Sequence, residues 1–287
     1  MRAQKLALAL AAALCVALPM AASAQTSNAQ SLYVERRALI ELDERCGLFG
    51  PNVRHALEAG AAQASGALLR SGWTSARLAE LEQASVNAAR GRACEDSRTI
   101  SAVRAAEAGF ASWSRTYSMS FAGAERVWLA RRTADIYGWR LYQQIPTPTA
   151  ATFGVAEHQD EQQLTFSMPA TGPAPASVQL VMRDPARAGT NLLDLRGRTT
   201  SGLAAGLASP NASQSFFANS RRTEREANAP ARFVFTFPGA AFQRLLQLDP
   251  RETIAIDIDV SGRTQRYLIE VGDIAAARAF LAISAES

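Results

Sequence analysis

Lysine is almost absent from this chain of 287 residues, and Lys5 is the only one. Without lysine in the body of the chain, there is no residue for a Schiff base, a phosphate-binding loop or a Ser-x-x-Lys acylase. The Gly-x-Ser-x-Gly and Gly-x-Gly-x-x-Gly fingerprints are missing as well. The sequence therefore excludes the common lysine-dependent enzymes, the usual serine hydrolase and the dinucleotide-binding oxidoreductase.

Cysteine and histidine are also scarce, with three cysteines and two histidines in the whole chain. Cys15 lies in an N-terminal apolar run, which leaves Cys46 and Cys94 as an isolated pair. In an oxidising compartment such a pair predicts a disulfide, which would stabilise the fold by roughly 4 kcal/mol in the chain-entropy model. A structural zinc needs four Cys or His ligands, so the sequence predicts neither a metal site nor a cofactor.

The chain has almost no net charge once the two basic residues at its N-terminus are left out. The formal net charge is +4, and Arg2 and Lys5 supply half of it. Segments 25–116 and 151–287 are nearly balanced, and only 117–150 is locally basic. Because a balanced surface has no long-range field, we expect no nucleic-acid partner.

Long hydrophobic runs are absent beyond the N-terminus. Arg2 and Lys5 precede an apolar run from Leu6 to Ala17, and Ala22-Ser23-Ala24 then offers small residues. This pattern predicts a secretory signal peptide that is cleaved after Ala24, with no transmembrane segment after cleavage. The dominance of Arg and Ala suggests a GC-rich bacterium, so we expect a periplasmic protein.

The remaining sequence predicts an α+β fold in which a disulfide-linked helical region precedes a mainly antiparallel β region with short helices. We expect a signal peptide at 1–24, a helical domain at 25–116, an aromatic and Arg-rich connection with the first strand or strands at 117–150, and an α+β domain at 151–287.

Three- and four-residue spacing of apolar residues predicts four helices before residue 116,. The first ends near Cys46, the second begins at Pro51 and stops at Ser71-Gly72, the third ends at Gly91, and Asp96 or Ser97 caps the fourth. Short connections between amphipathic helices indicate antiparallel packing. The disulfide would then join the end of the first helix to the turn before the fourth.

Alternating apolar residues predict strands in the second half,. The clearest are 139–145, 152–156, 163–168, 178–182 and 233–237. Residues 215–226 are predicted to form a charged helix, and a short helix follows Pro238-Gly239.

The C-terminal segment predicts a β-hairpin and a last helix. A two-residue turn at Gly262-Arg263 would pair Ile258 with Tyr267 and set Asp259 opposite Arg266,. Asp273 would cap a helix over Ile274–Ile283.

This strand, hairpin and helix (Phe233–Phe237, Ile254–Val271, Ile274–Leu281) resemble the periplasmic domain of the invasion-associated locus B family. The resemblance covers the last third of the chain. Members of that family tend to carry cysteines in the β-domain, whereas here both remaining cysteines lie in the helical half. The resemblance implies a small extracytoplasmic module of non-enzymatic type.

The strongest candidate for a binding site is the aromatic–Arg segment 110–142, where aromatic side chains alternate with arginines. Aromatic faces with guanidinium groups suit a groove for sugars, peptides or an acidic partner. The alternative is that these rings form the core between the two halves. The candidate binding residues are Trp128, Arg131, Arg132, Tyr137, Trp139, Arg140 and Tyr142.

We therefore expect an exported binding module of the bacterial envelope, with no catalytic residues, whose partner is an envelope protein or a cell-wall component. The alternative is a carboxylate-dependent hydrolase of cell-wall glycan that uses Asp257 and Asp259, or the acids in 157–161,. His55 is predicted to pair with Glu58 on a helix surface, and His158 to lie in a polar turn.

Overall fold

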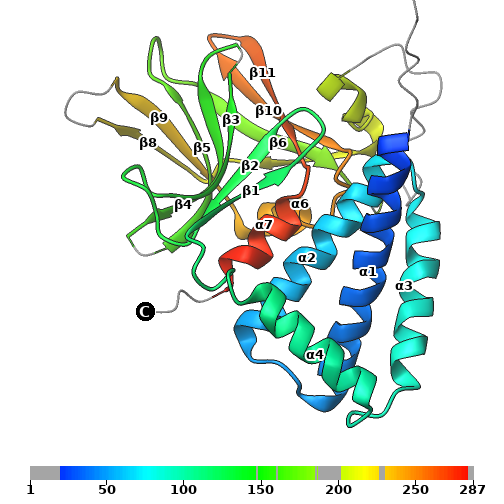
Figure 1. Cartoon of the computed structure of the whole chain (residues 1–287). Coiled ribbons are helices and arrows are strands. Elements are labelled where there is room, and N and C mark those ends of the chain that lie inside the picture. Colours follow the sequence, from blue (N-terminus) through cyan, green and yellow to red (C-terminus); the bar gives the residue numbers. More distant parts are fainter. Residues whose placement is uncertain are drawn as a thin grey trace, which may run out of the picture.

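The computed structural model describes residues 20–146, 148–159, 161–184, 186, 202–225 and 230–283. It confirms the α+β class, with helices first and two antiparallel sheets after them (Figure 1). Residues 1–19 lie outside the described residues, so the signal peptide and its cleavage after Ala24 stay predictions.

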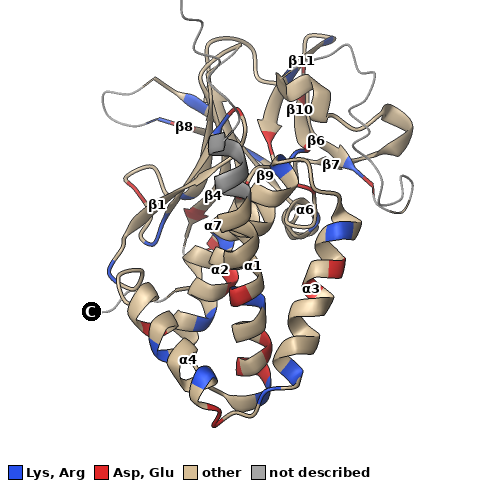
Figure 2. Ribbon diagram, turned by 45° about the vertical axis from the view of Figure 1, so that its right-hand side comes forward, with Lys and Arg blue, Asp and Glu red and all other residues tan. Residues whose placement is uncertain are grey.

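The four predicted helices are present. They are α1 (Met20–Cys46), α2 (Pro51–Arg70), α3 (Ser75–Arg90) and α4 (Ser97–Phe110). Pro51 opens α2, and the side chain of Asp96 caps α4 by accepting from the Arg98 N–H. Thr74 caps α3 by accepting from the Arg77 N–H. Arginine and acidic side chains occur together on α1 and α3 (Figure 2).

The predicted disulfide is confirmed. Cys46 and Cys94 are bonded, with Cα atoms 5.9 Å apart and a sequence separation of 48. The bond joins the end of α1 to the turn before α4, as expected. Helix α4 fully buries only Thr99 and Ala106 and packs on the core through the half-buried Ala102 and Phe110. The disulfide adds a covalent attachment just before this helix.

Two antiparallel sheets face each other as a sandwich. The larger has the order β1-β2-β3-β4-β5-β9-β8, and the smaller has the order β11-β10-β6-β7. The bounds are β1 (Ser118–Ala122), β2 (Val127–Arg131), β3 (Trp139–Ile145), β4 (Ala151–His158), β5 (Glu161–Pro169), β6 (Ser177–Arg183), β7 (Ser213–Phe217), β8 (Ser220–Glu224), β9 (Arg232–Phe237), β10 (Thr253–Val260) and β11 (Arg263–Glu270). The strands β1 and β2, which belong to the larger sheet, were not expected as separate strands.

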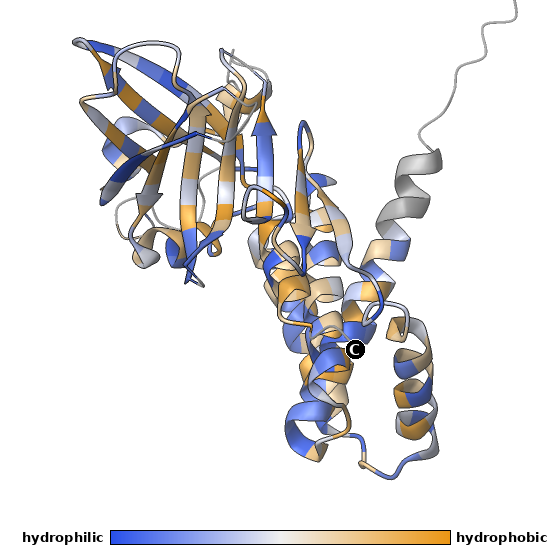
Figure 3. Cartoon of the chain, turned by 90° about the vertical axis from the view of Figure 1, so that its left-hand side faces the viewer, coloured by the Kyte–Doolittle hydropathy of each residue, from blue (hydrophilic) through white to orange (hydrophobic). Residues whose placement is uncertain are grey.

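The core lies between the sheets, and buried apolar residues of both sheets form one cluster there,. Hydrophobic and hydrophilic residues alternate along several strands (Figure 3). Trp128, Phe153 and Phe166 from the larger sheet pack with Ile256 and Tyr267 from the smaller one. Two short helices close the sandwich, α6 (Gly239–Leu245) and α7 (Ile274–Leu281). Helix α7 lies between the sandwich and α2 (Figure 1).

The predicted charged helix over 215–226 is wrong. This segment forms most of β7 and all of β8, which belong to different sheets. Phe216 packs on the core opposite Leu180, and β8 pairs with β9. A polar strand at the edge of a sheet has only a weak apolar alternation, so its sequence resembles a polar helix.

The predicted hairpin register is wrong by two residues. The turn is Ser261-Gly262, with φ of 53° and 76°, which suits a two-residue turn that needs positive φ twice,. Ile256 therefore faces Tyr267, and Arg266 faces Asp257 instead of Asp259. A shift of two residues keeps every side chain on its face, so the apolar pattern could not exclude it.

Asp273 begins α7 but does not cap it with its side chain. Its carboxylate instead accepts two hydrogen bonds from the Arg70 guanidinium, at 2.6 and 3.0 Å. Burial raises the pKa of the Asp273 carboxyl, and Arg70 opposes that rise,. This buried ion pair joins α2 of the helical region to α7 of the β region.

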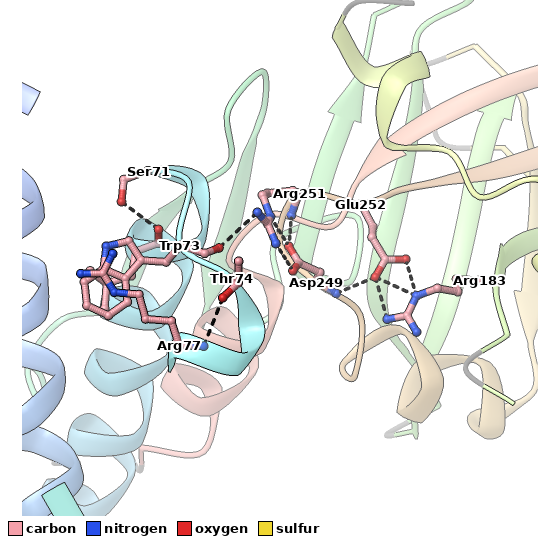
Figure 4. Close-up of polar contacts among 9 residues, drawn as sticks. Ser71, Trp73, Thr74, Arg77, Arg183, Asp249, Arg251 and Glu252 are labelled. Atoms are coloured by element: carbon pink, nitrogen blue, oxygen red, sulfur yellow. Dashed lines mark hydrogen bonds and ion pairs between the residues drawn. The ribbon is translucent and has the colours of Figure 1, made fainter. Parts of the chain in front are cut away.

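A second junction joins the same two regions (Figure 4). Arg251 donates to the Trp73 carbonyl at 3.3 Å and is held by the Asp249 carboxylate at 2.8 Å. Beside it, Glu252 is 3 % exposed and accepts from the Arg183 guanidinium at 2.8 to 3.0 Å. The loop before β10 is thus fixed to both the helices and the smaller sheet.

Glu270, at the end of β11, joins the two sheets. Its side chain is buried, and its carboxylate accepts from the backbone N–H groups of Ala124, Glu125 and Arg126 in the β1–β2 turn. Its backbone carbonyl accepts from Trp128 Nε1 at 3.1 Å. One residue of the smaller sheet therefore positions the start of the larger one.

We predict that replacing Cys46 and Cys94 together by alanine lowers the free energy of unfolding by up to about 4 kcal/mol, because the unfolded chain gains entropy. Since α4 buries so little, hydrogen exchange should accelerate first in α4 and the turn before it. Urea denaturation and exchange mass spectrometry measure both effects. Unchanged protection of α4 would contradict this account.

We predict that Glu270→Gln lowers the free energy of unfolding by about 3 kcal/mol, because an amide replaces a buried charged acceptor and can turn its NH₂ toward backbone donors. Glu80→Gln, on the exposed side of α3, is the control. It should change the free energy of unfolding by less than about 0.5 kcal/mol. Equal free energies of unfolding for the two variants in urea denaturation would show that the Glu270 carboxylate does not stabilise the β1–β2 turn.

Candidate functional site

A groove of about 780 Å³ lies on the face of the larger sheet that points away from the core. Its volume is within the range of ligand-binding clefts. We call it the outer groove. It is lined by Arg131, Ala134, Asp135, Ile136, Tyr137, Trp139, Tyr142, Gln144, Thr152, Ala156, Thr165, Ser167, Arg222, Glu224, Pro230, Arg232 and Val234.

The floor of the outer groove carries hydroxyl groups. Thr152, Thr165 and Ser167 point to this side because they alternate along β4 and β5 with the core residues Phe153 and Phe166,. The three hydroxyl residues are at most 6 % exposed although they face away from the core. The floor therefore combines largely covered hydroxyl groups with the apolar side chains of Ala156 and Val234.

One wall is aromatic. A register shift between Trp139 and Leu141 in β3 puts Trp139 and Tyr142 on the same face, with ring centroids 6.0 Å apart,. Gly154 of β4 is the cross-strand partner of Tyr142. A Cβ at Gly154 would overlap the Leu141 carbonyl oxygen and lie 2.7 Å from Tyr142 Cα. Glycine is thus required beside Tyr142, and the floor carries no side chain there.

The loop between β2 and β3 forms the rim above this wall. Asp135 Oδ1 accepts from the backbone N–H groups of Tyr137 and Trp139, both at 2.9 Å. Gly138 supports the turn with a φ of 82°,. The loop holds Ile136 and Tyr137 in the open, at 86 % and 52 % exposure. Two exposed apolar side chains on a well-bonded loop are typical of a contact surface.

The opposite wall is charged. Arg222 and Glu224 of β8 pair at 2.6 Å. Arg232 of β9 donates to the Ser167 hydroxyl at 2.7 Å and to the Ser167 carbonyl at 3.0 Å. Across the groove, Arg131 lies 3.6 Å from the Asp135 carboxylate. The lining therefore mixes both signs of charge.

Four of the seven candidate binding residues line the outer groove, namely Arg131, Tyr137, Trp139 and Tyr142. Trp139 is 8 % exposed and presents only part of its ring. The structure thus brings these four together at one site, as part of one wall and rim.

The other three candidates lie elsewhere. Trp128 is fully buried, and its Nε1 donates to the Val271 carbonyl at 2.8 Å. Arg132 is 6 % exposed and lies over the Phe280 ring, 4.8 Å from its centroid. Arg140 pairs with Glu157 at 2.9 Å and does not line the groove. The segment 110–142 therefore supplies both the core and the groove.

The sequence analysis did not identify the floor and the charged wall as parts of a site. Thr165, Ser167 and Arg232 occupy the outward positions of two strands that were expected, so the alternation places them on one face. Arg222 and Glu224 were not identified as site residues because the sequence predicts a helix where β8 lies. Their convergence depends on β5, β9 and β8 being neighbours in the sheet.

The carboxylates considered for hydrolysis lie outside the groove. Asp257 is 7 % exposed and is held by two contacts from Arg266, both at 2.6 Å. Asp259 accepts from the Gly262 N–H in the hairpin turn. Of the acids in 157–161, Glu157 pairs with Arg140, and Asp160 lies outside the described residues.

His55 lies as predicted, whereas His158 belongs to strand β4 and not to the turn that follows it. His55 Nδ1 is 3.2 Å from the Glu58 carboxylate on the surface of α2. His158 ends β4 opposite Glu161. Within the part of the chain that the structure describes, no three His, Cys, Asp or Glu side chains form a group that could hold a metal ion.

No helix among the described residues is long and apolar enough to span a membrane. No family model matches the chain, and neither a curated protein nor a solved structure is significantly similar to it. The site is therefore interpreted from its own geometry.

Proposed function

We propose that this chain is an exported binding module of the bacterial envelope that holds its ligand in the outer groove and performs no chemistry on it. The observation that carries the proposal is the groove itself, a concave site of about 780 Å³ with an aromatic wall and polar groups that converge on it,. Four residues that the sequence singles out for binding line it.

The bonding of the groove's acidic groups supports binding. Asp135 is engaged by two backbone N–H groups of its own loop, and Glu224 is paired with Arg222. A general acid or base needs a carboxyl group that can exchange a proton with a substrate. In both residues the carboxylate instead fixes the shape of the wall to which it belongs.

Export is supported by two features of different kinds. The N-terminus has the charged start, apolar run and small residues of a secretory signal,. The Cys46–Cys94 bond is of the kind that persists in oxidising compartments,. Together they favour a location outside the cytoplasm.

We predict that Tyr142→Ala combined with Arg222→Ala abolishes retention of envelope material by the immobilised protein, because the double variant loses one side chain from each wall. The control combines Tyr117→Ala with Arg263→Ala, at two exposed positions that do not line the groove, and should retain as much as the wild type. Thermal unfolding of both variants confirms that they are folded.

Equal retention by the groove variant and the wild type would refute the groove as the site. The non-catalytic part has its own test. Purified protein is incubated with peptidoglycan, and soluble sugar fragments are measured. A release of fragments that disappears in Asp257→Asn would favour the hydrolase.

A further inference from the structure

We infer that the ligand of the outer groove is a glycan, a chain of pyranose sugars that lies across the hydroxyl floor with a ring against the aromatic wall. This inference rests on the proposed binding function and names its ligand class. It follows from four properties of the groove.

The backbone of the floor is not available to a ligand. Strand β3 pairs with β2 and β4, β4 pairs with β5, and β5 pairs with β9. A peptide that binds by strand addition needs the free edge of a sheet. The floor consists of interior strands and offers side chains alone, so recognition of a peptide backbone is disfavoured there.

The side chains of the floor suit hydroxyl groups. A Ser or Thr hydroxyl both donates and accepts, as does each hydroxyl of a sugar. Thr152 donates to Gln144 Oε1 at 3.4 Å, and Thr165 donates to the Gln163 carbonyl at 3.0 Å. Ser167 accepts from Arg232 Nε at 2.7 Å. The two Thr oxygens can still accept a hydrogen bond from a ligand hydroxyl, and the Ser167 hydroxyl can still donate one. An acyl chain in the same place would leave this remaining hydrogen-bonding capacity unused. The floor therefore favours a polyhydroxylated ligand over a lipid tail.

The aromatic wall suits the other side of a sugar ring. A pyranose has an apolar C–H face and a rim of hydroxyl groups, and Tyr and Trp likewise combine an apolar face with a polar tip. Tyr142 is half-buried beside Trp139, and Tyr137 is 52 % exposed on the rim. An aromatic wall beside a hydroxyl floor matches both sides of such a ring at once.

The charges of the groove nearly cancel, because Arg131, Arg222 and Arg232 stand against Asp135 and Glu224. Arg222 is paired with Glu224, and Arg131 lies beside Asp135. Arg232 donates to the Ser167 hydroxyl and carbonyl. The lining therefore has no strong excess of positive charge of the kind that a phosphate chain requires. Planar guanidinium and carboxylate groups can take part in hydrogen bonds with neighbouring hydroxyls of a sugar.

The test is isothermal titration calorimetry of the full exported chain with soluble glycan strands. One arm uses peptidoglycan strands freed of their peptides, and the other uses polysaccharide released from lipopolysaccharide, so that the two envelope sources are distinguished. We expect saturable binding in one arm. Tyr142→Ala should weaken it about tenfold or more, because an aromatic anchor is lost.

Two matched variants separate the role of the ring from a general loss of structure. Tyr142→Phe keeps the aromatic face, so its Kd should stay within about threefold of the wild-type value. The loss of a single good contact would raise the Kd by more than that. Tyr117→Ala removes a tyrosine that is 64 % exposed away from the groove lining and should bind like the wild type.

Absence of saturable binding in both arms, or equal binding by Tyr142→Ala, would overturn the glycan assignment. If envelope material is still retained in a groove-dependent way, the ligand class is wrong while the binding function stands. Groove-dependent binding of the free stem peptides would assign a peptide instead. Loss of groove dependence in the retention experiment would refute the function itself.

Discussion

The buried carboxylate of Glu270 is the contact on which the β region depends. It satisfies three backbone donors of the β1–β2 turn, while its own backbone carbonyl receives the indole of Trp128. A buried charge is stable only when it is hydrogen-bonded in this way. The end of β11 therefore determines where β1 and β2 begin, and through them where the larger sheet lies over the smaller one.

The sequence predicted the elements whose signals are local. Pro51 and Asp96 are effective helix starts whatever surrounds them, and the four helices appear where their apolar spacing placed them. The phenylalanines of 233–237 alternate strongly enough to define β9. The Cys46–Cys94 bond followed from the scarcity of thiols, without knowledge of the fold.

The errors have a common cause. In each, the contact that determines the structure either joins residues that are far apart in the sequence or leaves the apolar pattern the same in the predicted and the observed arrangement. A two-residue shift of the hairpin moves Arg266 from Asp259 to Asp257 and leaves every face as it was,. Asp273 has the sequence of a cap, but Arg70, which is 203 positions away, takes its carboxylate. Trp128 and Trp139 are only 11 positions apart in the sequence, yet one is core and the other lines the groove.

The groove arises from the same strand alternation that builds the core. Phe153 and Phe166 face inward, so Thr152 and Thr165 must face outward, and the sheet that closes the sandwich also becomes a floor,. Because Glu270 fixes the start of β2 and Asp135 fixes the loop that follows it, the aromatic wall is formed before any ligand arrives. A preformed wall spares a ligand the entropy of ordering it. The closure of this fold therefore supplies a preformed wall for the binding that we propose.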